Sequence, residues 1–146
     1  MNVLFLPREG VELFRTLHLS ETSRDALRFY RPHERYGGVV VTMSSLGSAL
    51  SLASDLRWYV KRYMREVLFE IMDGIFCTHE LAREIYYDRS VLPEEPWNYR
   101  RLYVIEDNRL VSTDKVTNTG SDIKHAGQES KISIEVWCTE HEYSLD

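Results

Sequence analysis

The strongest hydrophobic pattern of the chain runs from Leu46 to Ile71. Apolar residues recur there at alternating spacings of three and four positions, the periodicity of an amphipathic helix. A continuous helix over 46–73 would be about 42 Å long at 1.5 Å per residue, which is long for one small domain. We therefore expect either a break near Ser54, whose hydroxyl would cap a second helix, or a homodimer that covers the rest of the apolar stripe.

Shorter segments on both sides of this helix predict further helices and strands. The predicted helices are 11–19, a second helix whose capping box starts at Thr22, and 79–87, capped by Thr78. The predicted strands are 2–6, 39–43, 99–105, 110–116 and 131–138, with a tight turn at 107–108. This order predicts a single α+β domain over 1–146. Its long central helix packs on a mostly antiparallel sheet that ends in a C-terminal hairpin plus a strand, and the polar segment 117–130 is expected to be a mobile loop.

Composition indicates a soluble globular protein, because 43% of the residues are hydrophobic and 28% are charged. The first residues contain too short an apolar run, and no basic leader, for a secretory signal. The uncharged stretch 37–54 carries too many serines and glycines for a membrane span. With two cysteines in 146 residues, we expect an intracellular protein, cytoplasmic or nuclear, that is not secreted.

Charge is unevenly distributed along the chain. Ten basic and six acidic residues lie up to Arg65, whereas eight basic and seventeen acidic residues follow from Glu66 onward. Three stretches, "LRFYRPHERY", "LRWYVKRYMR" and "WNYRRLY", interleave arginine with aromatic residues. The candidate binding residues from the first two are Arg28, Arg31, Arg35, Arg57, Trp58, Lys61, Arg62 and Arg65.

On the predicted long helix, Arg57, Lys61 and Arg65 are four residues apart and would form one basic ridge. Arginine and aromatic residues are enriched at protein interfaces. They also contact phosphates and stack on unpaired bases. A solvated helix face, with ion pairs to Glu66 and Glu70, is a third explanation of the same pattern.

Both cysteines lie in similar segments, "FCTHELA" (76–82) and "WCTEHEY" (137–143). Together, Cys77, His79, Cys138 and His141 have the ligand types of a tetrahedral zinc site, although Cys-x-His is not a standard zinc-binding spacing. The simpler interpretation places both cysteines in the core as small hydrophobic residues and leaves both histidines on the surface. A disulfide is disfavoured without an oxidising compartment.

No phosphate-binding loop, nucleophile elbow or His-Glu-x-x-His motif occurs in the chain. We therefore expect a non-enzymatic accessory or regulatory protein, of a kind found in viruses and phages, that binds a macromolecular partner, in first place a protein, as a homodimer. A nucleic-acid-binding protein is the second hypothesis, and a zinc-stabilised or Cys- or metal-centred enzyme is the third. Apart from this zinc, no cofactor is expected.

Overall fold

The computed structural model describes residues 1–88, 97–116 and 131–145, so the predicted mobile loop at 117–130 lies outside the described residues. The strands are β1 (Asn2–Pro7), β2 (His33–Arg35), β3 (Gly38–Thr42), β4 (Met64–Met72), β5 (Ile75–Thr78), β6 (Arg100–Glu106), β7 (Arg109–Lys115) and β8 (Lys131–Trp137). The α-helices are α1 (Leu13–Leu19), α2 (Glu21–Leu27), α3 (Leu46–Asp55), α4 (Arg57–Tyr63), α5 (His79–Arg83) and α6 (Glu140–Ser144), and a π-helical turn, η1 (Glu84–Asp88), follows α5.

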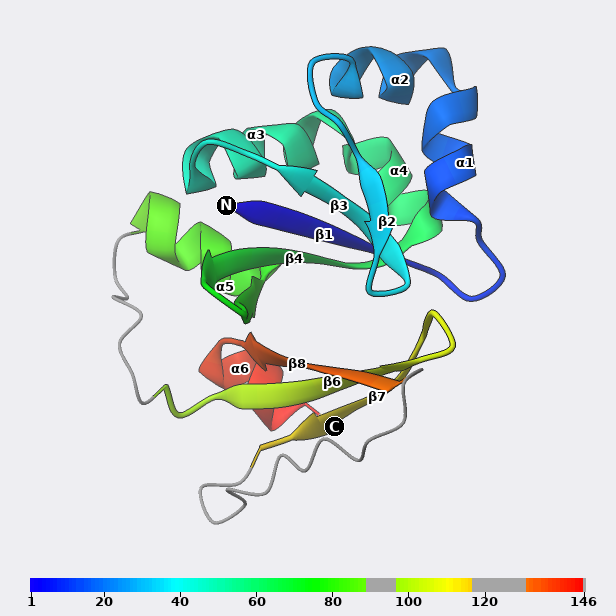
Figure 1. Ribbon diagram of the computed structural model, residues 1–146. Coiled ribbons are helices and arrows are strands. Elements are labelled where there is room, and N and C mark those ends of the chain that lie inside the picture. Colours follow the sequence, from blue (N-terminus) through cyan, green and yellow to red (C-terminus); the bar gives the residue numbers. More distant parts are fainter. Residues whose placement is uncertain (89–96, 117–130, 146) are drawn as a thin grey trace.

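Within the described residues, eight strands form one sheet in the order β2-β3-β1-β4-β5-β8-β6-β7 (Figure 1). Neighbouring strands are antiparallel except β5 and β8, which are parallel. The mixed α/β architecture on a mostly antiparallel sheet confirms the predicted fold class.

One face of the sheet is covered by helices α1 to α5, which Figure 1 shows gathered mainly above the sheet. This face forms the larger core, where Val3, Phe5 and Phe69 of the sheet pack against helix residues such as Leu17 and Leu50. Because both faces of the central strands are buried, these strands are nearly continuous hydrophobic runs rather than alternating ones.

The other face of the sheet is covered by the sheet itself, which curls on this side. A second core joins Leu4 of β1 and Leu68 of β4 to Tyr103 of β6 and Val136 of β8. The β2–β3 turn meets the β6–β7 turn, since a Cβ atom added at Gly37 would lie 2.5 Å from the backbone oxygen of Asn108. We call this inner side the concave face.

The predicted helix over 46–73 is wrong as a single element. It breaks after Asp55, near the expected point, but Leu56 rather than Ser54 holds the N-cap position of α4. The chain then leaves the helix at Met64, and residues 64–72 form β4, between β1 and β5. The apolar residues assigned to one long helix are therefore divided between two short helices and a central strand. The predicted capping box at Thr22 is also wrong, because α2 begins at Glu21 and its N-cap residue, Ser20, makes no side-chain capping hydrogen bond.

Other local predictions are confirmed. Thr78 caps α5, accepting a hydrogen bond of 3.2 Å from the Leu81 amide. The predicted hairpin turns at Asp107 and Asn108, both with positive φ as primed two-residue turns require. None of the helices that the structure describes has both the length and the apolar character needed to cross a membrane.

Candidate partner-binding surface and polar cavity

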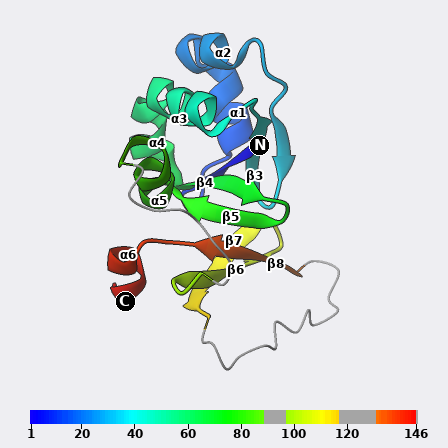
Figure 2. The same cartoon turned by 90° about the vertical axis from the view of Figure 1, so that its left-hand side faces the viewer.

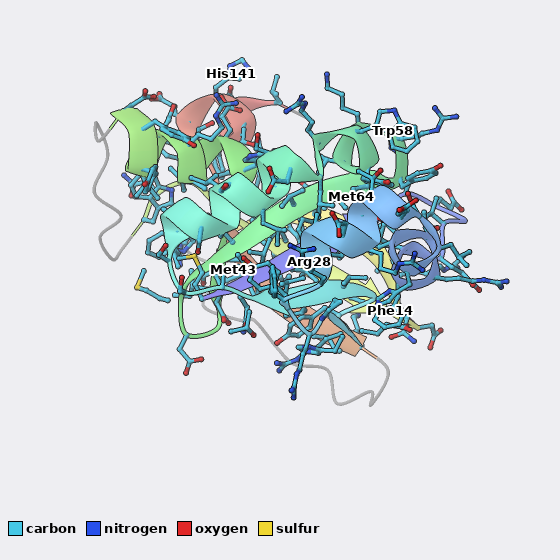
Figure 3. The ribbon with its side chains drawn as sticks, turned by 90° about the horizontal axis from the view of Figure 1, so that it is seen from above. Phe14, Arg28, Met43, Trp58, Met64 and His141 are labelled. Atoms are coloured by element: carbon cyan, nitrogen blue, oxygen red, sulfur yellow. The ribbon has the colours of Figure 1, made fainter. Side chains whose placement is uncertain are left out.

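Helix α4 presents the basic and aromatic residues that the sequence singled out. Tyr59 is buried against the core, which turns Arg57, Trp58, Lys61 and Arg62 toward the solvent. We call these four exposed residues the α4 surface. The Trp58 side chain is 55% exposed, unusual for so large an apolar group, and Figure 3 shows it projecting from the edge of the molecule.

Aromatic contacts hold this surface in a defined shape. The guanidinium carbon of Arg62 lies 5.1 Å from the centroid of the Trp58 ring, within the range of a cation–π contact. The Trp58 ring meets Tyr59 edge-on at 5.0 Å and Tyr63 at 5.9 Å. The Tyr59 hydroxyl in turn hydrogen-bonds Ser20 between α1 and α2, and this bond lowers the pKa of Tyr59. The Trp58 side chain is thus exposed to solvent and also held in place by its contacts with Tyr59, Arg62 and Tyr63.

Positive charge is concentrated around Trp58. Arg8, which follows β1, adds to this charge. Its Nη2 donates a hydrogen bond of 2.7 Å to the Lys61 carbonyl, and its Nε donates one of 3.3 Å to the Met64 carbonyl. No member of the α4 surface forms an ion pair with any residue that the structure describes. The predicted partners are used elsewhere, since Glu66 bonds Tyr103 and Glu70 bonds Asn2. The helix face is solvated, but the ion pairs expected with Glu66 and Glu70 do not form among the described residues.

The predicted ridge of Arg57, Lys61 and Arg65 is wrong in one member. Arg57 and Lys61 are on α4, but Arg65 belongs to β4, where its Nη1 donates to the Leu110 carbonyl at 3.5 Å. Arg65 is exposed beyond the end of the helix. The break at Met64 changes the direction of the chain, so that helical spacing no longer relates Arg65 to Lys61.

The other three candidate arginines lie apart from α4. Figure 3 shows Arg28 well separated from Trp58. Arg28 follows α2, covers the exposed Phe29 ring at 4.5 Å and pairs with Asp25 at 3.4 Å. Arg31 is exposed in the following loop, and Arg35 is on β2 with its guanidinium over the Tyr36 ring at 4.5 Å. The structure does not join these residues to the α4 surface.

The two similar cysteine segments lie side by side as the parallel strands β5 and β8. The sequence similarity would align Cys77 with Cys138, but in the sheet Cys77 pairs with Trp137, one residue earlier. Because alternate residues of a strand point to opposite faces, Cys77 enters the helix-covered core while Cys138 lines a cavity on the concave side. Both cysteines are free and buried.

The similarity between these segments reflects two equivalent strand-to-helix turns. Thr78 begins α5 and Thr139 begins α6, each accepting a hydrogen bond from the amide three residues on. One carboxylate oxygen, Oε1 of Glu142, accepts two hydrogen bonds, one of 2.5 Å from the Thr78 hydroxyl and one of 3.0 Å from the Thr139 amide. Figure 2 shows α5 and α6 on the same side of the molecule.

The proposed zinc ligands are not gathered at one point. His79 packs against Phe69 at 5.4 Å between ring centroids, and His141 is exposed on α6. Among the described residues, no group of three or more His, Cys, Asp or Glu side chains could hold a metal ion. Burial raises the pKa of Cys77 well above that of a free thiol and raises the pKa of Cys138 to about 11. Both thiols are therefore protonated at neutral pH, which makes them weak nucleophiles and ligands.

A polar cavity on the concave side was not predicted. It lies where the parallel strands β5 and β8 end, and its volume is about 400 Å³. Strands β4, β5, β6 and β7 each contribute to it, and Cys138 follows β8. Its polar lining comprises Arg65, Glu66, Thr78, Cys138, Arg101, Tyr103 and Thr113, with Glu142 from α6. A second cavity of about 600 Å³ adjoins it and shares Arg65, Glu66, Thr78 and Glu142.

Glu66 and Tyr103 are the central pair of the polar cavity. The Tyr103 hydroxyl donates a hydrogen bond of 2.7 Å to Oε1 of Glu66 across the concave face. Burial raises the pKa of Glu66, opposed by this hydrogen bond and by the nearby Arg65. Burial and the Glu66 charge also raise the pKa of Tyr103 far above its usual value. The signal in the sequence was a pair of glutamates, Glu66 and Glu70, within the otherwise largely apolar segment "MREVLFEIM".

Taken together, the structure defines an α+β protein with one strongly curved mixed sheet, a basic and aromatic surface on a short helix, and a polar cavity at the carboxyl ends of two parallel strands. The chain belongs to the DUF5804 family, described as a family of unknown function, whose model matches residues 1–105. That range contains the α4 surface, Glu66 and Tyr103, and it ends before Cys138 and α6. Comparison with curated proteins and with solved structures gave no match.

Proposed function

We propose that the protein is a non-enzymatic accessory or regulatory protein that binds an acidic segment of another protein through the α4 surface. The observation that carries this proposal is an exposed, well-supported tryptophan among cations that have no ion pair within the described residues. An exposed tryptophan beside arginines is typical of binding hot spots. Unpaired cations around it favour a partner with negative charge.

A protein partner is favoured over a nucleic acid for two reasons. The chain has a net charge of −5, which repels a polyphosphate beyond the immediate α4 surface. In addition, the Arg62 guanidinium already covers one face of the Trp58 ring, whereas stacking on unpaired bases needs open aromatic faces.

The test is selection of acidic peptides from a displayed library with the full chain as bait, followed by affinity measurements on the selected peptides. We expect Trp58→Ala to weaken binding by about 2 kcal/mol, about 30-fold in Kd, because a hot-spot aromatic side chain is lost. Arg62→Glu should weaken binding as well. The matched control is Arg24→Glu, which reverses the charge of an exposed arginine on α2. Equal affinity of the wild type and both α4 variants would contradict the proposal.

The same variants test the nucleic-acid alternative. A single-stranded DNA or RNA oligonucleotide that binds the wild type at low salt, and is lost on reversing Arg57, Lys61 and Arg62, would replace the protein partner with a nucleic acid. Binding of such an oligonucleotide that is undiminished in this triple variant would exclude the α4 surface as a nucleic-acid site.

The predicted homodimer is tested separately, because the long helix that motivated it does not exist. Native mass spectrometry of the full chain, purified without chelator, measures the mass of the assembly and any bound zinc together. A dimer would retain self-association as part of the proposal, and a monomer would assign the α4 surface to other partners.

The same spectra test the zinc site. One zinc per chain would support Cys77, His79, Cys138 and His141 as ligands. We do not expect bound zinc, because Cys77 and Cys138 point to opposite faces of the sheet. We keep an intracellular location, cytoplasmic or nuclear, in the proposal because both cysteines are free.

A further inference from the structure

A groove at one end of the sheet is lined by three arginines. It lies between the β1–α1 turn, the first residues of β4 and the β6–β7 hairpin, and its volume is about 560 Å³. These segments contribute Arg8, Arg65 and Arg109, one from each. We call this feature the arginine groove. Its volume lies within the range of small-molecule sites.

Two β-bulges place side chains in the arginine groove. The register of β1 with β4 shifts after Leu6, which leaves Arg65 as an extra residue of β4. The register of β6 with β7 shifts after Val104, which leaves Val111 as an extra residue of β7. Both extra residues line the groove. Bulges change the direction of a side chain and are common next to functional sites, so their coincidence at one groove favours a binding role.

The arginines of the groove are held in place without losing their charge. Arg8 donates to two backbone carbonyls at the end of α4, and Nη1 of Arg65 donates to the Leu110 carbonyl, beside Arg109. A carbonyl group fixes a guanidinium but carries no charge to neutralise it. None of the three arginines forms an ion pair with any residue that the structure describes. Their charge is therefore available to an anion.

The remaining lining indicates the chemical class of that anion. Glu9 and Glu12 also line the groove, so three arginines against two glutamates leave it with a small positive excess. Val11 and Val111 add apolar surface, and Val111 is 52% exposed. The planar fork of arginine matches the oxygens of a phosphate, and the valines match an apolar group attached to it.

We propose that the arginine groove binds a small organic phosphate, a phosphomonoester with an apolar substituent. Its phosphate oxygens accept hydrogen bonds from Arg8, Arg65 and Arg109, and its apolar part lies against Val111. Three cations suit a phosphate dianion, which has three terminal oxygens, better than a carboxylate, which has two. This site uses other side chains than the α4 surface and does not depend on the proposed protein partner.

The test is titration calorimetry of the full chain with phenyl phosphate at low salt and about pH 8, where the phosphate is a dianion. We expect phenyl phosphate to bind more tightly than inorganic phosphate or benzoate, and phenol not to bind. Arg109→Gln should raise Kd about tenfold or more, because hydrogen bonds to a charged group are lost. Glu9→Gln should lower Kd, because it removes a negative charge from the groove. The matched control is Arg24→Gln, an exposed arginine of α2, which should bind as the wild type does.

Two further variants locate the ligand. Val111→Ser should reduce the preference for phenyl phosphate over inorganic phosphate, because it removes apolar contact. Trp58→Ala separates the groove from the α4 surface, and loss of phenyl phosphate binding in this variant would overturn the proposal. Equal affinity of Arg109→Gln and the wild type, equal affinity for benzoate and phenyl phosphate, or no binding of phenyl phosphate would overturn it as well.

Discussion

At the scale of single residues, Glu66 is the most informative position in the molecule. It occupies an inward-facing position of a central strand, with Leu68 of the same face in the concave core. A charged carboxylate is costly there, and burial accordingly raises the pKa of Glu66. The folded protein therefore holds a proton on this side chain more tightly than the unfolded chain does.

This linkage predicts how stability depends on pH. The stabilising contribution of Glu66 is full below the ordinary glutamate pKa of 4.5 and is lost as pH rises through the raised value. We expect Glu66→Gln to remove this loss, so that the variant becomes more stable relative to the wild type as pH rises from the ordinary value of 4.5 into the neutral range. Urea unfolding across that range measures the difference.

Two comparisons support the interpretation of that experiment. Glu70→Gln should lose stability with rising pH to the same extent as the wild type. Burial lowers the pKa of His79, which gives stability that rises with pH toward the ordinary histidine value, but this contribution is common to both proteins and cancels in their difference. Parallel pH curves for the wild type and Glu66→Gln would show that Glu66 titrates normally.

At the scale of elements, the two strand-to-helix turns after β5 and β8 act as one unit. Each helix is only five residues long, too short to be stable without tertiary contacts. The threonine caps satisfy the first amides, and the Glu142 carboxylate bridges the two turns through the Thr78 hydroxyl and the Thr139 amide. The parallel pairing of β5 with β8 brings these turns together.

This bridge predicts energetic coupling between α5 and α6. Thr78→Val should cost about 0.5 to 2 kcal/mol through the lost cap, and Glu142→Ala should cost less in that background than in the wild type. A double-mutant cycle by urea unfolding should give a coupling energy of about 0.5 to 3 kcal/mol. Thr16→Val on α1 is the control partner, whose hydroxyl bonds only the Glu12 carbonyl among the described residues, and its effect should add to that of Glu142→Ala. Additivity of Thr78→Val and Glu142→Ala would contradict the bridge.

At the scale of the whole molecule, the concave core depends on the approach of the two ends of the sheet. The β2–β3 turn contains Gly37, with φ of +74°, and lies against the backbone of Asn108 in the β6–β7 turn. A side chain at Gly37 would force these turns apart and open the concave face. Gly10 has a similar φ of +80°, but a Cβ atom there would meet nothing within 4 Å.

These two glycines provide a matched test of sheet closure. Both Gly→Ala substitutions carry the cost of a positive φ, about 1 to 2 kcal/mol. Gly37→Ala should cost more than Gly10→Ala, because it adds a steric clash with backbone atoms. Urea unfolding of the two variants measures the difference, and equal losses of stability would mean that the turns separate without cost.

The sequence was a good guide where neighbouring residues decide the structure, and Met64–Met72 shows where it failed. Tyr63, Val67 and Ile71 are four residues apart, and residues at that spacing share a face in a strand as well as in a helix. Since both faces of β4 are buried, no alternation of polar and apolar residues distinguished the two. The β-branched and aromatic residues Val67, Phe69 and Ile71 were the remaining signal for a strand.

By itself, the sequence determined the mixed fold class, the Thr78 cap, the hairpin turn at Asp107 and Asn108, and the residues that make α4 basic and aromatic. Each of these follows from side chains within a few positions of one another. Only the tertiary structure decided that Cys77 and Cys138 face opposite sides, and that Glu66 meets Tyr103 thirty-seven positions away. The physical reason is strand order and register: pairing between strands distant in sequence fixes the face to which each side chain points.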